Sequence, residues 1–397
     1  MKHIILFVLI IQLAQSSTLT LKQMLDSANN NSTLTQALEQ ERLLLESRNL
    51  ADTSSDPMEL FGSAANANPL VGEDEIEYSV GLSKQFFLGN IQEEEQSINR
   101  LNNEAYFLEE DKKILNFENG LKRLYHNYCL DNKYYKVSKQ NYQQFVKLYK
   151  KKQKAYKYQE ISKAELMQLE IEKNRLYAQL QEIEMNQVIS KQKVFVLGRI
   201  NNANTTTLSC GDIYPIRENV KLDGGRFQLS QEAHTKRLKS TQVALERHSR
   251  SLDSISLSAQ YDKEIDIDRV GIGISIPLNF TSNRSEQERA AAMYASSALG
   301  FQHEQTMLEK RSRLLEFQSY LNSKARMLKT LKNNHRNYKK QLLPLIKKSY
   351  DLGETSVIEY LLNRQKSYQL RQEIYATKKS YYNTLFKLYA LSEMKDK

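Results

Sequence analysis

The 397-residue sequence contains no Trp, only two Cys, five Pro and 13 Gly. Residues that break helices or form turns are therefore scarce, which favours long helices and excludes a scaffold held by several disulfides. Long apolar runs are scarce too. Mean hydropathy is -0.62, and the longest apolar stretch, Ile4 to Leu13, is shorter than the ~20 residues that a bilayer-spanning helix needs. We therefore expect no transmembrane helix, and any insertion into a membrane would use strands.

This apolar stretch belongs to an N-terminal export signal. Ile4 to Leu13 is followed by Ala14-Gln15-Ser16, a small-x-small pattern of the kind that signal peptidase cleaves. We expect residues 1–16 to be a signal peptide and the mature chain to begin near Ser17. No Cys follows the cleavage site, so the sequence does not indicate the lipid anchor of a lipoprotein.

The two cysteines lie in different settings. Cys129 falls in a long helical region, whereas Cys210 falls in a Gly-rich connector. A sequence does not show that two side chains are close in space. We therefore expect two unpaired thiols, although export would place them in an oxidising compartment.

Positive charge exceeds negative charge in the sequence. The chain has 57 Lys and Arg against 47 Asp and Glu, a net charge of +10. The cations alternate with Glu and Gln along helical segments, as in residues 170–175, and this pattern is typical of a solvated helix face. The charge therefore does not predict nucleic-acid binding.

No group of residues indicates catalysis or metal binding. No two histidines are four residues apart; the histidines of the mature chain are His126, His234, His248, His303 and His335. His335 occupies a heptad position and is interpreted as a packed side chain. The sequence has neither a nucleophile elbow nor a Gly-rich phosphate loop. We expect no enzymatic activity, no cofactor and no metal site.

The chain contains an internal repeat. Residues 156–167 align without gaps on residues 350–361 and share Tyr, Glu, Ser and Glu at an offset of 194. Residues 81–86 similarly match residues 273–278. We therefore expect two structural repeats, residues 17–200 and 229–397, joined by an equatorial connector at residues 201–228. Each repeat consists of a helix, a strand pair and a long helical hairpin. The first helix is expected at about residues 21–49 in the first repeat and 229–250 in the second, and the returning helix of the first hairpin at about residues 162–197.

Strict alternation identifies the strands. In the second repeat two strands each have their apolar side chains on one face. In the first strand these are Ile255, Leu257, Ala259 and Tyr261, and in the second they are Val270, Ile272, Ile274, Ile276 and Leu278. The acidic segment Asp262 to Asp268 predicts a loop between them. In the first repeat the alternating residues are Ile76, Tyr78, Val80 and Leu82, and the partner strand is expected within Asp56 to Ala65. The edge of a soluble sandwich would also show one apolar face, but the small residues on the opposite face favour the lumen of a barrel.

The helices carry heptads. In the first repeat the seam is Phe107, Ile114, Leu121, Tyr128, Tyr135, Tyr142, Tyr149 and Tyr156, and the returning helix continues it with Leu169, Leu176, Ile183 and Leu197. In the second repeat the seam is Leu314, Leu321, Leu328, His335 and Leu342, followed by Ile374, Tyr381 and Leu388. Such a repeat predicts helices that supercoil around each other. A helix over residues 90–156 would be ~100 Å long, so neighbouring helices must cover it.

Two strand pairs are too few to form a closed sheet in a membrane. A barrel needs ~8 or more strands, and an open sheet in lipid would leave edge amide and carbonyl groups without partners. Several chains must therefore combine. Three chains would give twelve strands and a ring wide enough for a channel, and two would give a narrower tube.

The order of repeats, strands, helices and break motifs resembles the TolC family of outer-membrane efflux proteins over essentially the whole mature chain. The resemblance implies an α+β membrane protein, in which long antiparallel helical hairpins form a periplasmic tunnel and about four strands per chain contribute to a trimeric 12-stranded β-barrel. Residues 270–284, with Ser275-Ile276-Pro277-Leu278 followed by Asn283-Arg284, are similar to the heavy-metal cation branch.

In that family the two breaks form the periplasmic tip with a Gly-x-x-Ser signature. Gly353 and Ser356 fit this signature, whereas Gln159 stands where Gly is usual and Ser162 is kept. The resemblance implies that these tips dock onto an adaptor, and we expect the docking surface to be Gln159, Glu160, Ile161, Ser162, Gly353, Glu354, Thr355 and Ser356. Asp351 is a candidate gate residue. Simple turn chemistry, with Gly in the turn and Ser as a helix N-cap, remains an alternative for each.

The expected function is therefore that of a homotrimeric exit duct in the bacterial outer membrane. Its expected partners are outer-membrane lipid, a periplasmic adaptor (membrane fusion) protein and, through the adaptor, an inner-membrane pump. The exported material would be small solutes, with metal cations as one class. Two alternatives remain open: the channel of a type I protein secretion system, and a soluble periplasmic coiled-coil scaffold.

Overall fold

The computed structural model describes residues 18–67, 75–200, 206–222, 226–248, 252–264, 266–277 and 283–394, so the signal peptide expected at residues 1–16 lies outside the described residues. The chain forms two compact units. The first combines residues 1–36, 113–226 and 310–397, and the second combines residues 37–112 and 227–309. Both halves of the sequence contribute to each unit.

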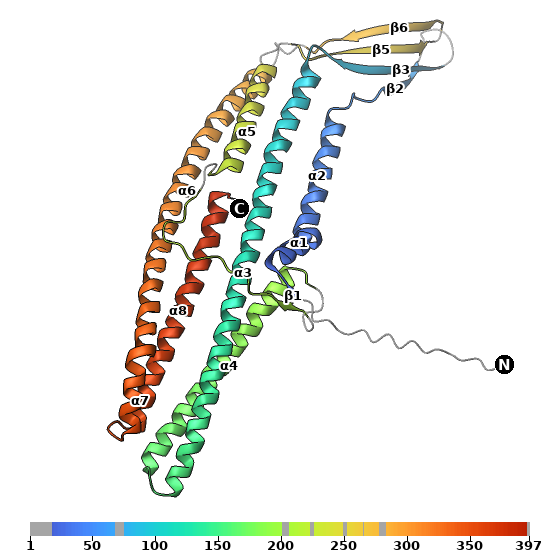
Figure 1. Cartoon of the computed structure of the whole chain (residues 1–397). Helices are drawn as coiled ribbons and strands as arrows, with labels where there is room; N and C mark the ends of the chain where they lie inside the picture. Colours follow the sequence, from blue (N-terminus) through green and yellow to red (C-terminus); the bar gives the residue numbers. More distant parts are fainter. Residues whose placement is uncertain are drawn as a thin grey trace, which may run out of the picture. The chain divides into compact units, whose positions relative to one another are not determined.

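The second unit contains an antiparallel sheet of four strands in the order β2-β3-β5-β6 (Figure 1). The strands are β2 (Glu59–Ala67), β3 (Glu75–Phe87), β5 (Ser254–Lys263) and β6 (Asp268–Ser275). Each repeat supplies one pair, and β3 pairs with β5 to join them. Both strand pairs predicted from alternation are therefore confirmed, although β6 ends at Ser275, before the predicted Ile276, and Leu278 lies outside the described residues. The partner strand expected within residues 56–65 is β2, which continues to Ala67.

Ion pairs join the helices of the second unit. Helix α5 (Gln228–Arg247) presents Lys236, Arg237 and Arg247 to Glu104, Glu109 and Glu95 of α3 (Ile91–Lys157). On α2 (Thr33–Asp52), Arg42 donates to the buried carboxylate of Glu110 at 2.7 Å and lies over the ring of Phe107. The interleaved charges of the sequence therefore include contacts between helices as well as solvated positions.

The first unit contains most of two helical hairpins, whose residues 91–112 and 284–309 belong to the second unit. The first hairpin is α3 and α4 (Lys163–Leu197), whose bounds lie within about a residue of those expected. The second hairpin is formed by α6 (Arg284–Asn337), the π-helical turn η2 (Tyr338–Leu342), α7 (Leu343–Asp351) and α8 (Val357–Ser392). The helical hairpins predicted from the heptads are confirmed (Figure 1).

Just over half of the predicted heptad positions are buried. The buried members are Leu121, Tyr128, Tyr149, Leu169, Leu176, Leu314, Leu321, Leu328, Ile374, Tyr381 and Leu388. Half-buried members are Phe107, Ile114, Tyr135, Tyr142, Ile183 and His335. Tyr156, Leu197 and Leu342, which lie toward helix ends, are exposed. A straight helix drifts by ~20° per heptad, so a seven-residue period leaves the core over a long helix.

The π-helical turn interrupts the outbound helix of the second hairpin just before Pro344, which lies in the first turn of α7. Proline has no amide hydrogen, and its ring clashes with the carbonyl four residues earlier, so a regular α-helix cannot pass through it unchanged. A π turn adds one residue and relieves this clash.

The single N-terminal helix expected at residues 21–49 is two helices. Helix α1 (Leu21–Asn31) ends at Ser32, whose backbone is extended, and α2 begins at Thr33. The Ser32 hydroxyl accepts a hydrogen bond from the Thr35 amide at 3.0 Å. Asn and Ser side chains compete for backbone hydrogen bonds, so the Asn29-Asn30-Asn31-Ser32 run favours a break.

The described part of the connector that belongs to the first unit, residues 206–222, packs against the helices of that unit. Its strand β4 (Thr207–Leu208) pairs in parallel with β1 (Thr18–Leu19). The Tyr382 hydroxyl donates to the Tyr214 carbonyl at 2.6 Å, and the Tyr214 amide donates to Nε2 of the fully buried His126 at 3.0 Å. Several of the chain's abundant tyrosines therefore hold backbone groups of the connector.

Cys129 and Cys210 form a disulfide, so the expectation of two unpaired thiols is wrong. Their sulfurs are 2.07 Å apart and their Cα atoms 5.5 Å apart, across 81 residues of sequence. The connector brings Cys210 onto α3 beside the core of Leu121, Tyr125 and Val194. A crosslink over a loop of this length stabilises by about 4.5 kcal/mol in the chain-entropy model. Proximity of this kind comes from packing and leaves no local sequence pattern.

In the part of the chain that the structure describes, none of the helices combines the length and the apolar character needed to cross a membrane.

Candidate functional site: two helical tips and a sheet face

The first tip follows the end of α3 at Lys157. Gln159 has a left-handed backbone with φ of 61°. Its amide donates to the Tyr156 carbonyl at 3.0 Å, and the Glu160 amide donates to the Ala155 carbonyl at 3.0 Å. This pair of hydrogen bonds is the Schellman motif, which satisfies carbonyl groups left open at a helix end.

The second tip repeats this backbone at an offset of 194 residues. Gly353 has φ of 79°, its amide donates to the Tyr350 carbonyl at 3.0 Å, and the Glu354 amide donates to the Ser349 carbonyl at 2.9 Å. Glycine adopts this region freely, whereas other L-residues pay roughly 1–2 kcal/mol. Gln159 therefore departs from the signature in residue type but keeps its geometry.

A serine begins the returning helix at each tip. Ser162 Oγ accepts from the Glu165 amide at 3.1 Å, and Ser356 Oγ accepts from the Glu359 amide at 3.1 Å. At the first tip Glu165 also accepts from the Ser162 amide at 3.0 Å, which closes a capping box. The turn chemistry that the sequence left as an alternative is therefore present at Gln159, Ser162, Gly353 and Ser356.

The predicted docking residues are mostly exposed, and their exposure repeats between the tips. Ile161 and Thr355, which are aligned in the two repeats, are half-buried, and the other six are exposed. Two further large side chains lie in these turns and were not among the predicted docking residues: Tyr158 and Leu352, which are 78% and 64% exposed. The available signal was the alignment itself, because it places a large apolar residue at the same turn position in both repeats.

One cluster of apolar side chains lies under both tips. Its buried members come from α3, α4 and α8 and are Phe145, Tyr149, Leu169, Leu176, Val357 and Leu361. Tyr350 stacks on Tyr360 with ring centroids 4.8 Å apart, and the Lys152 ammonium of α3 lies 5.2 Å from the Tyr350 ring centroid. The two tips therefore share one support and lie at the same end of the first unit (Figure 1).

The candidate gate residue, Asp351, lies at the end of α7. Its carboxylate is 3.8 Å from the Lys347 ammonium one helical turn earlier, and both side chains are exposed. An exposed pair of this kind contributes little to stability. A role for Asp351 in gating stays a prediction.

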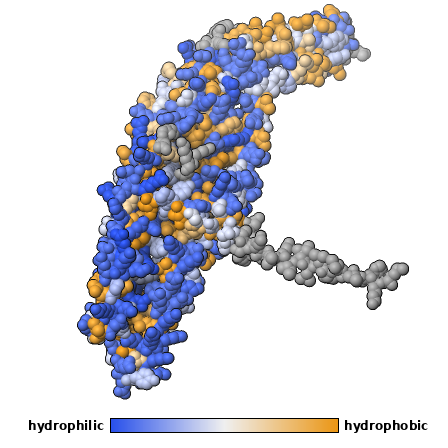
Figure 2. All heavy atoms as spheres, viewed as in Figure 1, coloured by the Kyte–Doolittle hydropathy of each residue, from blue (hydrophilic) through white to orange (hydrophobic). Residues whose placement is uncertain are grey.

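The sheet collects its apolar side chains on one face. In the strand register Leu82 lies opposite Ala259, which lies opposite Ile272, and Val80, Tyr261 and Val270 form the next row. Because residues directly opposite point to the same side, these rows share a face. Val270 and Ile272 are 83% and 84% exposed, so the described residues leave this face uncovered. Apolar side chains dominate the surface of the strands in Figure 2.

The opposite face of the sheet is mostly small and polar. It carries Ser79, Ser83, Ser258, Gln260, Gly271 and Gly273 in the same register. The hydroxyls of Ser63 and Ser79 hydrogen bond at 2.9 Å. Phe61 is an apolar exception: its ring covers Gly81, where an added Cβ would lie 2.4 Å from Cζ. The two faces therefore suit different surroundings, one apolar and one aqueous.

The described residues contain no group of three or more His, Cys, Asp or Glu side chains able to hold a metal ion. They do bring His234 of α5 and His303 of α6 into a parallel stack with ring centroids 3.8 Å apart. Burial, and then the charges of His303 and Arg237, lower the pKa of His234. Sequence spacing did not indicate this pair because the two residues lie on different helices.

Searches of protein-family models and of curated proteins find no match to this chain. Solved structures do match. The CmeC outer membrane channel of Campylobacter jejuni has a TM-score of 0.74 at 15% identity, over 95% of this chain and 87% of that chain. The outer membrane protein VceC of Vibrio cholerae has a TM-score of 0.74 at 12% identity, over 94% of this chain and 96% of that chain. The MtrE outer membrane channel of Neisseria gonorrhoeae has a TM-score of 0.71 at 13% identity, over 94% of this chain and 88% of that chain.

These likenesses cover nearly the whole of both partners in each comparison. Sequence identity is too low to carry a shared activity, but the fold is shared. The mixture of long helical hairpins and a small sheet expected from the sequence is therefore confirmed, and the chain has the fold of TolC-like outer-membrane channels.

Proposed function

We propose that this chain is one subunit of a trimeric channel in the bacterial outer membrane, the exit duct of a tripartite efflux system for small solutes. The observation that carries the proposal is the sheet, whose apolar face is exposed and whose opposite face is small and polar. Lipid would cover the first face, and water in a lumen would contact the second.

The edges of the sheet support assembly from several copies. Within the described residues, β2 and β6 are the edge strands and pair on one side only. In lipid each unpaired edge group would cost several kcal/mol. Because the four strands alternate in direction, β6 of one copy and β2 of the next would continue the antiparallel order. Three copies would close a barrel of twelve strands.

The tips are the proposed docking surface for a periplasmic adaptor, which would connect the duct to an inner-membrane pump. Two exposed apolar side chains, Tyr158 and Leu352, lie beside the predicted docking residues on one common support. Large apolar or aromatic anchors surrounded by polar groups are typical of protein interfaces. We extend the proposed surface to include both.

Metal cations are the finer proposal for the exported solute. It depends on the similarity of residues 270–284 to the heavy-metal branch and on Asp351 as a charge at the tip. Sensitivity of a deletion strain to a panel of metal salts, dyes and detergents would identify the class. Sensitivity to dyes and detergents without sensitivity to metals would contradict the metal proposal and keep the duct.

The duct itself is tested at the sheet with a matched pair of substitutions. Ile272→Lys places a charge on the exposed apolar face, whereas Gln260→Lys places it on the opposite face one row away. A lysine facing the bilayer midplane costs about 2–4 kcal/mol. We expect Ile272→Lys to reduce the amount of trimer recovered from outer membranes, and Gln260→Lys to leave it unchanged. Equal recovery of both variants, or a wild-type chain that fractionates as a soluble monomer, would contradict the proposal.

A further inference from the structure

A polar cavity lies between the two hairpins of the first unit, well before the tips. Its volume is ≈ 320 Å³, and α3, α8 and the junction of η2 with α7 form its walls. Tyr368, which is buried, contributes its ring, and its hydroxyl hydrogen bonds with Ser138 at 2.7 Å and donates to the Tyr134 hydroxyl at 3.2 Å. Hydrogen bonds among the hydroxyl groups of Tyr368, Ser138 and Tyr134 therefore fix the position of the Tyr368 ring in the cavity wall.

The spacing of the lining residues matches two helix faces turned toward each other. Helix α3 contributes Val137, Gln140, Asn141 and Gln144, and helix α8 contributes Arg364, Ser367, Tyr368 and Arg371. Both sets follow the i, i+3, i+4, i+7 spacing of one helical face. The third wall is Lys339 in the π turn and Leu343 one turn later. π turns inside α-helices are frequent at functional sites.

The cavity has three cations and no acidic side chain in its lining. Lys339, Arg364 and Arg371 line it, and the other seven lining residues are neutral. Arg364 donates to the neutral Gln144 Oε1 at 3.0 Å, and Arg371 donates to His335 Nε2 at 3.2 Å. Elsewhere in this unit cations do have carboxylate partners, such as Lys310 with Glu393 and Lys379 with Asp131.

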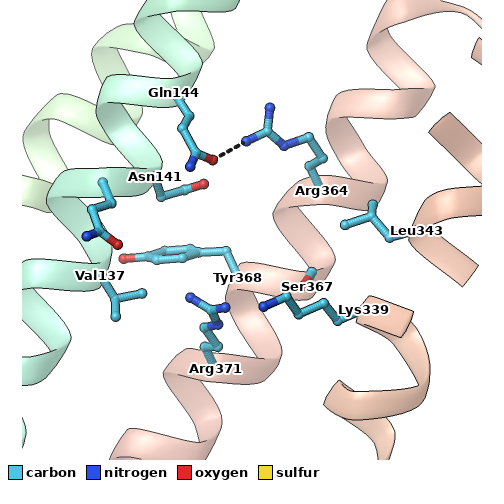
Figure 3. A pocket seen from close by; sticks show the side chains of 10 residues that line it. Val137, Asn141, Gln144, Lys339, Leu343, Arg364, Ser367, Tyr368 and Arg371 are labelled. Atoms are coloured by element: carbon cyan, nitrogen blue, oxygen red, sulfur yellow. Dashed lines mark hydrogen bonds between the residues drawn. The ribbon is translucent and has the colours of Figure 1, made fainter. Parts of the chain in front are cut away.

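The charged groups converge instead of turning away from one another. In Figure 3, Lys339 and Arg371 extend toward each other beside the Tyr368 ring, and Arg364 reaches across to Gln144 on α3. Two of these charges act on His335, whose pKa is lowered first by burial and then by Arg371 and Lys339. Like charges held together between packed helices are unfavourable unless an anion neutralises them.

We infer that this cavity binds a small multivalent oxyanion, of the size and charge of inorganic phosphate or sulfate. Arginine guanidinium groups bind such oxygens through charge-assisted hydrogen bonds, and the amides of Gln140, Asn141 and Gln144 add further donors. A bound anion would contact both hairpins, so its occupancy would favour the packed arrangement of the two near their tips. This site does not depend on the proposed export function.

The test measures phosphate binding by the purified full-length protein in detergent. Equilibrium dialysis with radiolabelled inorganic phosphate, at constant ionic strength, should give saturable binding of one phosphate per chain. Arg364→Gln and Arg371→Gln should each weaken binding about tenfold, because each removes a charged donor. The matched control is Lys366→Gln, which removes an exposed cation of α8 outside the cavity and should bind like wild type.

Two further measurements distinguish loss of the binding site from loss of the fold. Thermal unfolding and oligomer content of each variant show that the fold is intact, and Arg371→Lys, which retains the charge, should recover part of the affinity lost in Arg371→Gln. Sulfate should compete with phosphate, whereas chloride at equal ionic strength should not. The inference would be overturned by an absence of saturable phosphate binding or by an equal loss of affinity in Lys366→Gln. It would also be overturned if a monocarboxylate competed more strongly than sulfate, a result that would indicate a binding site for an acidic side chain.

Discussion

The first hairpin turns through Gln159, and the second turns through Gly353. Both tips nevertheless have the same two Schellman hydrogen bonds, a serine N-cap and a half-buried residue between them. The comparison shows that backbone pairing and capping define this turn, and that glycine only lowers its conformational cost. The capping box at Ser162 helps the first tip to tolerate its Gln.

The hairpins differ more along their length than at their ends. Helix α3 runs without interruption over 67 residues, whereas the outbound helix of the second hairpin has a π turn before Pro344. The second hairpin also contributes all three cations of the cavity. The two halves of the chain therefore share a fold and a tip geometry, but they differ in the charge that they contribute to the cavity between the hairpins.

Of the changes within the two hairpins, the largest effect is expected from a β-branched residue at the glycine of the second tip. Gly353 has open space around its Cα, so the cost of Gly353→Val comes from φ alone and should be about 2 kcal/mol. Hydrogen exchange of the Glu354 amide should accelerate about 30-fold, and export should fall while trimer content stays constant.

The control is Gly300→Val, because Gly300 also has open space but lies within α6. This variant should leave the Glu354 amide unaffected. Equal acceleration in both variants would mean that the left-handed backbone is not the cause. Unchanged export by Gly353→Val, in the presence of faster exchange, would count against docking at this tip.

A smaller effect is expected from removing each N-cap. Ser162→Ala and Ser356→Ala should each cost about 1 kcal/mol, because the amide of Glu165 or Glu359 loses its acceptor. Exchange of these amides should accelerate about fivefold, and Ser→Asp at either position should restore protection. A loss at one tip only would show that the tips are less alike than their geometry indicates.

Acid should destabilise the second hairpin through His335. Its pKa is lowered from 6.5 by burial and by Arg371 and Lys339, so the folded chain binds a proton less readily than the unfolded chain. The stability is therefore complete above pH 6.5 and declines as pH falls through the lower folded pKa.

The urea midpoint of wild type should accordingly drop between pH 7.5 and 5. The drop should be smaller in His335→Gln, which retains an acceptor for Arg371 but does not titrate. His234 in the second unit contributes in the same direction, because its pKa is lowered too, so part of the drop should remain. An identical drop in wild type and His335→Gln would exclude His335 as a source.

The smallest effect, and a gain, is expected from making the first tip resemble the second. Gln159→Gly removes the conformational cost of a non-glycine residue at φ 61°. The greater conformational entropy of glycine in the unfolded chain offsets part of this gain. We expect slower exchange of the Glu160 amide, by a net stabilisation of about 0.5 kcal/mol. Faster exchange would show that the Gln159 side chain contributes contacts of its own.

Local patterns were sufficient for the elements of this protein. Alternation located β3, β5 and β6, and heptads located α3 and α4 to within about a residue, because side-chain periodicity directly reflects which face is apolar. The serine caps and the tip glycine were likewise visible, since turn chemistry depends on the residue types themselves. The break at Ser32 was missed because the helical period continues on both sides of it.

Contacts between distant segments came only from the tertiary structure. The Cys129–Cys210 disulfide, the His234–His303 stack and the convergence of Lys339 with Arg364 and Arg371 join residues on different elements. Each depends on how the connector or the helices pack, and one chain's sequence has no local signal for that packing. The sequence therefore determined which faces of the helices and strands are apolar, and the tertiary packing determined which side chains are in contact.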